Sequence, residues 1–122
     1  MQGFRRLHVW EKAHELTIEV YKATARFPKD EIYALTSQTK RAAASIGANI
    51  GEGCGRGSDA DFTRFLLIAM GSASELEYHL LLARDLGFLP EEDYGRLDAL
   101  TTEVKRMRAS LIQKTRQRTA VG

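Results

Sequence analysis

A glycine-rich segment in the middle of the chain separates two long helical patterns and constrains the fold more than any other feature. Residues 45–58 hold five of the ten glycines in the sequence, namely Gly47, Gly51, Gly53, Gly55 and Gly57. Because glycine has no Cβ and tolerates positive φ angles, this density predicts a helix end and a tight reversal. Ser58 can then cap the next helix, with Asp61 near its positive end. We therefore expect two helical hairpins joined at this segment.

The rest of the sequence carries apolar residues at the three- and four-residue spacing of helices. These patterns predict helices over residues 9–27, 30–52, 59–86 and 90–117. Pro28 is expected to end the first helix, because the residue before a proline is pushed out of the α region. Four long helices with short connections predict one all-α domain over residues 1–122, folded as an antiparallel up-down-up-down four-helix bundle.

Three of these helices have informative surfaces. The last one repeats apolar residues in a strict seam, at Leu97, Leu100, Val104, Met107 and Leu111. The second is rich in small residues, and the cost of about 1 kcal/mol for Gly47 in a helix interior predicts close packing against it. The third is apolar nearly all round at residues 65–68 and 80–82, more than one bundle covers. A second burial partner is indicated, so we expect a homo-oligomer.

The expected cellular compartment is inferred from the lack of a cysteine pair, a signal peptide and a membrane-spanning stretch in the sequence. The single cysteine excludes an internal disulfide, and no apolar run near the N-terminus suggests a signal peptide. No uninterrupted apolar stretch approaches the roughly 20 residues that span a bilayer. We expect a cytoplasmic protein with no membrane partner.

The net charge of +2 hides a strongly basic C-terminal end. Residues 104–122 contain six cations and no acid, so the remaining residues, with 12 basic and 16 acidic side chains, are mildly acidic. The six cations are the candidate nucleic-acid-binding residues, Lys105, Arg106, Arg108, Lys114, Arg116 and Arg118. A basic end on an acidic body favours a polyanion partner, whereas the alternative is a solvated helix end whose cations suit the macrodipole. No aromatic residues are interleaved with these cations, so binding is expected to be insensitive to sequence.

Signatures of catalysis and metal binding are incomplete. A di-metal centre in a bundle needs two Glu-x-x-His pairs, and only Glu11 with His14 fits. The glycine-rich segment matches neither G-x-G-x-x-G nor a P-loop. Cys54 has no neighbouring histidine or acid in the sequence that would activate it. We therefore predict no metal, no cofactor and no enzymatic activity.

A polar stripe runs along the second predicted helix. Its residues stand at i, i+4, i+8 and i+11, and two further polar residues on the third helix complete the set, which is Arg41, Ser45, Asn49, Glu52, Ser72 and Glu75. Polar residues among small apolar ones favour a buried structural network that fixes the register of the helices. Catalysis by Arg41, Glu52 and Glu75 is the less favoured alternative.

Several short motifs resemble one family when taken together. They are residues 4–13 (FRRLHVWEKA), 27–28 (FP), 33–38 (YALTSQ), 41–42 (RA), 45–46 (SI), 49–53 (NIGEG), 65–66 (FL), 69–72 (AMGS), 75–76 (EL) and 86–89 (LGFL). The chain resembles, over residues 4 to about 112, the bacterial four-helix bundle proteins of the 23S rRNA intervening-sequence family. It departs from that pattern at Gly51, where the family more often has alanine.

The resemblance implies an antiparallel four-helix bundle that assembles as a ring, commonly a homopentamer, without an established enzymatic activity. Related accessory proteins of diversity-generating retroelements bind nucleic acid and a reverse transcriptase. Two hypotheses therefore stand side by side. The protein is either an oligomeric module that binds RNA or DNA through basic surface, or a structural or protein-binding scaffold with no nucleic-acid role.

Overall fold

The protein consists of four α-helices and two short 3-10 turns. The structure is a computed structural model that describes residues 3–121, with side chains for residues 3–107 and for Leu111. The elements in chain order are η1 (Phe4–Arg6), α1 (His8–Thr24), η2 (Lys29–Glu31), α2 (Leu35–Arg56), α3 (Asp59–Asp85) and α4 (Glu91–Val121). No strand occurs among residues 3–121, so the predicted all-α class is confirmed.

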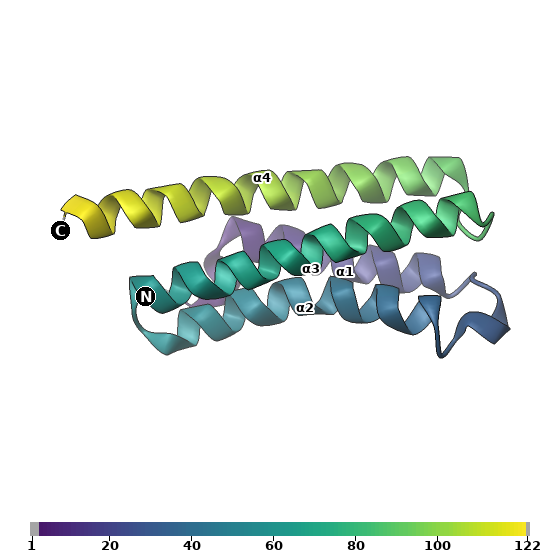
Figure 1. The fold of residues 1–122 in the computed structure, drawn as a ribbon, viewed down its shortest axis with the longest axis horizontal. Helices are drawn as coiled ribbons and strands as arrows, with labels where there is room; N and C mark the ends of the chain where they lie inside the picture. The colour runs from purple at the N-terminus through teal and green to yellow at the C-terminus, as the bar shows by residue number, and fades with distance from the viewer. Residues whose placement is uncertain (1–2, 122) are drawn as a thin grey trace.

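The helices form a four-membered bundle in which each packs on its neighbours in the chain. Figure 1 shows consecutive helices running in opposite directions, with the α1–α2 and α3–α4 connections at one end and the α2–α3 turn at the other. Contacts join α1 to α2, α2 to α3, α3 to α4 and α4 back to α1. The largest fully buried side chains come from all four helices and include Leu16, Ile46, Phe62, Leu76 and Leu97.

The connection between α1 and α2 is longer than predicted. Helix α1 ends at Thr24, three residues before the predicted end, and the backbone N–H of Phe27 bonds to the Thr24 carbonyl in a tightened last turn. The Phe27 side chain is buried and lies 6.1 Å, between ring centroids, from Phe88 of the α3–α4 connection. Helix α2 starts at Leu35 rather than residue 30, because η2 occupies the intervening segment.

The glycine-rich segment is mostly helical, contrary to the predicted reversal. Helix α2 continues to Arg56, and only Gly57, at φ +82°, adopts the left-handed conformation that ends it. Ser58 caps α3 as expected, accepting a hydrogen bond of 3.1 Å from the Asp61 backbone N–H. The reversal therefore takes two residues, Gly57 and Ser58.

The helical glycines of α2 allow other elements to approach its backbone. A Cβ at Gly47 would lie 3.4 Å from Trp10 Nε1, an ordinary van der Waals contact, so the close packing predicted at this residue stays a prediction. A Cβ at Gly53 would lie only 2.9 Å from Phe65 Cβ, so α3 crosses closely there. Packing, rather than turn formation, thus accounts for Gly53.

Helix α3 is the most apolar element. By length and composition it could cross a bilayer, but nine of its residues are buried within the bundle, as in a core helix. Leu67 and Ile68 remain 43% and 42% exposed on its outer face. These two side chains are the part of the predicted second apolar surface that a single chain leaves uncovered.

Helix α4 contributes the predicted seam only in part. Leu97 and Val104 are fully buried, whereas Leu100 lies at the edge of the core. Thr101 takes a buried place beside them, and its hydroxyl donates to the Leu97 carbonyl at 2.8 Å. The seam is therefore narrower than the spacing indicated.

Candidate functional site

The basic end of α4 extends beyond the rest of the bundle. In Figure 1 the C-terminal part of α4 projects well past the α2–α3 turn. The described core contacts of α4 end with Met107 and Leu111. The helix continues to Val121, and three of the six predicted cations, Lys114, Arg116 and Arg118, follow Leu111.

The six predicted cations do not share one environment. Lys105 is half-buried, and its Nζ lies 3.0 Å from Glu77 Oε1, so part of its charge is already compensated within the bundle. Arg106 is exposed. The side chains of the other four, Arg108, Lys114, Arg116 and Arg118, lie outside the described residues.

Three residues of the predicted polar network meet between α2 and α3. The hydroxyls of Ser45 and Ser72 are 2.8 Å apart. The side-chain amide of Asn49 donates to both the carbonyl and the hydroxyl of Ser45, at 2.8 and 2.9 Å. Only the Ser45–Ser72 hydrogen bond joins α2 to α3, whereas both Asn49 hydrogen bonds stay within α2. A role of this group in fixing the register of the two helices stays a prediction.

The other three members of that set, Arg41, Glu52 and Glu75, are exposed, so they are not part of a buried network. At 100° per residue, Arg41 and Glu52 lie on the same side of the stripe, and both are exposed, whereas Ser45 and Asn49 on its other side are partly buried. Glu52 pairs with Arg56 at 3.1 Å, and a Glu75 oxygen lies 3.8 Å from His79 Nε2. Among the described residues no hydrogen bond or ion pair joins these three to one another, so the geometry does not favour the catalytic alternative.

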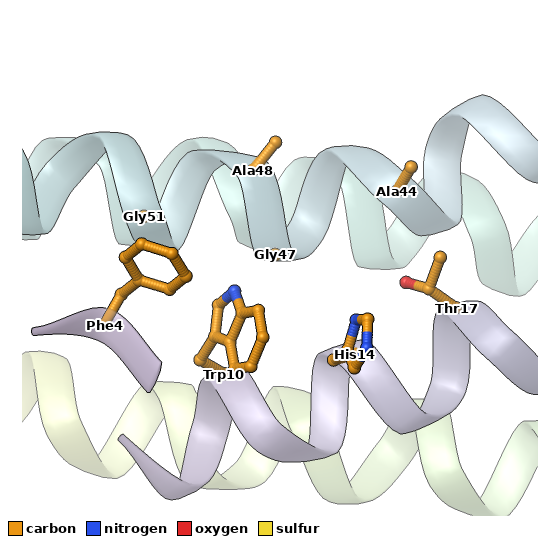
Figure 2. A pocket seen from close by; sticks show the side chains of 8 residues that line it. All are labelled: Phe4, Trp10, His14, Thr17, Ala44, Gly47, Ala48 and Gly51. Atoms are coloured by element: carbon orange, nitrogen blue, oxygen red, sulfur yellow. The ribbon is translucent and has the colours of Figure 1, made fainter. Parts of the chain in front are cut away.

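A groove between α1 and α2 was missed at the sequence level. One part, of about 460 Å³, is lined by the N-terminal segment and by both helices, and Figure 2 shows its lining side chains: Phe4, Trp10, His14, Thr17, Ala44, Gly47, Ala48 and Gly51. A second part, of about 670 Å³, shares Ala44 and Ala48 with the first and continues toward the α1–α2 connection. We call the two parts together the α1–α2 groove.

The two walls of the α1–α2 groove differ in character. Aromatic rings form the wall on the N-terminal side: Trp10 stacks on His14 with centroids 4.9 Å apart, and Phe4 meets Trp10 edge-on at 5.1 Å. Small residues of α2 form the opposite wall of the groove. The spacing of Ala44, Gly47, Ala48 and Gly51 at i, i+3, i+4 and i+7 was the signal available in the sequence.

At the far end, the α1–α2 groove becomes aromatic and basic. Tyr33 is 95% exposed and Ile32 is 55% exposed. The Lys40 ammonium lies 4.6 Å from the ring centroid of Tyr21, and Arg41 lines the same part. Among the described residues no carboxylate lines either part of the groove.

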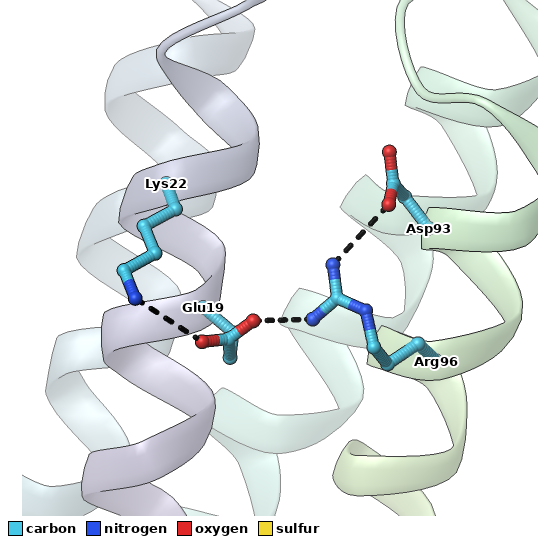
Figure 3. A network of polar contacts seen from close by, with 4 residues as sticks. All are labelled: Glu19, Lys22, Asp93 and Arg96. Carbon is cyan, nitrogen blue, oxygen red and sulfur yellow. Dashed lines mark hydrogen bonds and ion pairs between the residues drawn. The ribbon is translucent and has the colours of Figure 1, made fainter.

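A separate charged network ties α1 to α4. Figure 3 shows Arg96 of α4 between Glu19 of α1 and Asp93 on its own helix, with Lys22 completing the chain. Arg96 donates to both carboxylates. Each charge in this partly exposed cluster has an opposite neighbour, and the pair between Arg96 and Glu19 links the two helices.

No described group suits nucleophilic or metal chemistry. Burial raises the pKa of the Cys54 thiol, which keeps it protonated and a poor nucleophile at neutral pH. Among residues whose side chains are described, no group of three or more His, Cys, Asp or Glu side chains could hold a metal ion.

Comparisons with known proteins agree with the resemblance seen in the sequence. Residues 5–110 match the family model described as 23S rRNA-intervening sequence protein. A crystal structure from Bacteroides thetaiotaomicron VPI-5482, described as a protein with unknown function from the S23 ribosomal protein family, has a TM-score of 0.80 and 29% identity. That likeness covers 86% of this chain and 95% of the other. No curated protein matches the chain.

Proposed function

The chain belongs to the 23S rRNA-intervening sequence protein family, and we propose that it is a non-enzymatic module that binds nucleic acid, chiefly RNA, through the cationic end of α4. The observation that carries this proposal is the projection of α4 beyond the bundle. The projecting end belongs to a segment with six cations and no acid after residue 103, a charge pattern that favours a polyanion partner.

The expected mode of binding is contact with phosphates. Lysine and arginine side chains that neutralise phosphates release condensed counterions, so affinity falls steeply as salt rises. Such contacts position a strand without reading its bases. The partial neutralisation of Lys105 by Glu77 leaves Arg106 and the four cations beyond it as the principal contacts.

A non-enzymatic role is supported by the separation of the polar candidates. Catalysis requires an acid and a base held in contact with complementary environments. Arg41, Glu52 and Glu75 stand apart and in water, and the Cys54 thiol is held protonated by burial.

A second candidate, a self-assembling scaffold, is favoured by the outer face of α3. Leu67 and Ile68 are neighbouring apolar side chains left partly exposed on the most apolar helix. We infer that this face is covered by a second copy of the chain, and the resemblance favours a closed ring of five. Assembly and nucleic-acid binding are compatible, because a ring repeats the basic end of α4 once per subunit and so raises avidity.

Titration of a fluorescently labelled RNA tests the proposal. In one variant, Lys114→Ala, Arg116→Ala and Arg118→Ala are combined. The control combines Lys12→Ala, Lys22→Ala and Arg64→Ala, which lowers the net charge equally but removes cations that already pair with carboxylates on their own helices at 3.4, 3.7 and 3.6 Å.

The wild type and the control variant should bind at low salt, and the α4 variant should bind at least tenfold more weakly. Equal affinities for the two triple variants would show that net charge alone matters and would contradict the role of α4. Absence of binding by the wild type would favour the scaffold instead.

A further inference from the structure

The α1–α2 groove has the chemical character of a surface that holds bases as well as phosphates. It runs along α2 from Thr36 to Gly51, which corresponds to about 22 Å at 1.5 Å per residue. A groove of this length suits a strand of about four nucleotides, the lower end of the range for single-strand grooves. Neither part of it uses any of the cations assigned to the end of α4.

Tyr33 is the most exposed of the large hydrophobic side chains that the structure describes. A tyrosine that is 95% exposed buries almost none of its ring in the folded chain. Tyr21 lines the same part of the groove, and the Lys40 ammonium covers one face of its ring at 4.6 Å, so two aromatic rings from different elements line this part. Rings arranged in this way offer stacking surfaces for unpaired bases, whatever their identity.

The charges around these rings select a polyanion over an apolar segment. Lys40 and Arg41 line the groove beside the tyrosines, and the Lys40 ammonium lies over the Tyr21 ring at 4.6 Å. Arg5 and Arg6 are exposed at the other end, next to Phe4. Cations at both ends and no lining carboxylate match the backbone of a strand laid along the groove.

Hydroxyl groups add polar contacts within the same wall. The Thr36 hydroxyl is buried and has no hydrogen-bond partner among the described groups, although Thr36 lines the groove. Ser37, one residue further on, also lines it. Because the Thr36 hydroxyl is shielded from solvent, the partly exposed Ser37 hydroxyl is the one of the two that a ligand in the groove can reach.

We propose that the α1–α2 groove is a second nucleic-acid site, which takes a single strand with bases stacked on Tyr33 and Tyr21 and phosphates on Lys40 and Arg41. This inference rests on the proposed function and adds to it a preference for unpaired strands. In a duplex the base faces are stacked on one another, so they are not available to the tyrosines. The end of α4, which contacts phosphates only, makes no such distinction.

The test compares two probes, an oligouridine of about ten nucleotides and the duplex that it forms with oligoadenosine, a length that exceeds the roughly four nucleotides expected in one groove. Both probes are titrated with the wild type, Tyr33→Ala, Tyr33→Phe and a matched control, Tyr78→Ala, which removes a tyrosine 59% exposed on α3. All four proteins are also measured with the three α4 substitutions added, so that binding by α4 does not mask the groove.

Tyr33→Ala should weaken single-strand binding by about five- to a hundredfold and leave duplex binding unchanged, because one stacked base is lost. Tyr33→Phe should retain wild-type affinity, since the ring remains, and Tyr78→Ala should also match the wild type. Lys40→Ala and Arg41→Ala should weaken single-strand binding and reduce its salt dependence.

The binding measurements distinguish an error in the groove proposal from an error in the proposed function. If Tyr33→Ala binds the single strand like the wild type while the α4 variant loses both probes, the groove proposal is wrong and the function stands. If neither probe binds the wild type, both are wrong. If Tyr33→Ala leaves RNA binding intact but lowers the mass of the protein in solution, the groove is a contact between protein chains, which also overturns the proposal.

Discussion

Gly51 and Gly53 lie two residues apart on α2 and meet different neighbours. A Cβ at Gly51 would lie 3.6 Å from the Phe4 ring, an ordinary van der Waals contact with a side chain. A Cβ at Gly53 would lie 2.9 Å from Phe65 Cβ and 3.4 Å from Phe62 Cα, so it would press on the backbone of α3. The same residue type is therefore dispensable at one position and required at the other.

Gly51→Ala should raise the free energy of unfolding by about 0.5–1 kcal/mol, because glycine in a helix interior is less stable than alanine by that amount. Gly53→Ala should lower it by on the order of 1–3 kcal/mol, because the extra methyl group forces a shift in a packed helix pair. Urea denaturation of both variants measures the two changes. Changes of the same sign would show that the close approach at Gly53 does not limit packing.

The sequence predicts the environment of some single residues and not of others. Glycine density correctly indicated that the chain needs freedom near Gly57, but it does not distinguish a turn from a close helix contact. The contact at Gly53 depends on where α3 crosses α2, which local sequence does not encode. The partial burial of Ser45, Asn49 and Ser72 was predictable from their place among small residues. The exposure of Arg41 depends on how far α3 covers α2.

Among the elements, α4 shows that helical spacing alone does not decide which side chains are buried. Leu97 and Leu100 belong to the same predicted seam, yet Leu97 is fully buried and Leu100 lies at the edge of the core. Thr101 occupies the buried place between Leu97 and Val104. A one-residue difference of 100° around the helix decides which side chain faces the other three helices.

Leu97→Ala should therefore cost about 2–5 kcal/mol of unfolding free energy, as expected for a fully buried leucine. Leu100→Ala should cost less than Leu97→Ala, because part of that side chain is already in water. Thermal or urea denaturation of the two single variants gives the order. A larger loss for Leu100→Ala would restore the broader seam that the spacing predicted.

The whole molecule combines a well-packed bundle with two surfaces that a single chain leaves open. One is the outer face of α3, and the other is the α1–α2 groove. Fold class and helix number followed from periodicity, because buried faces repeat at the helical spacing. The groove did not, because its walls come from residues far apart in the sequence, such as Phe4 and Gly51.

Light scattering after size exclusion should give a mass several times 13.7 kDa for the wild type. Combining Leu67→Asp with Ile68→Asp should reduce that mass, because charge on the covered face opposes association. Leu86→Asp, which changes a side chain 53% exposed near the end of α3, serves as the control and should leave the mass unchanged. A wild type of 13.7 kDa at micromolar concentration would contradict assembly.

Binding of nucleic acid by the end of α4 is the central claim, and the salt dependence of RNA affinity tests it most directly. The logarithm of the association constant for a single-stranded RNA is measured against the logarithm of salt concentration for the wild type and for the variant with Lys114→Ala, Arg116→Ala and Arg118→Ala. Three lost phosphate contacts should make the slope shallower by about 2 for each subunit that touches the strand. Equal slopes for the two proteins would mean that these cations do not contact phosphates, and the account of α4 would be wrong.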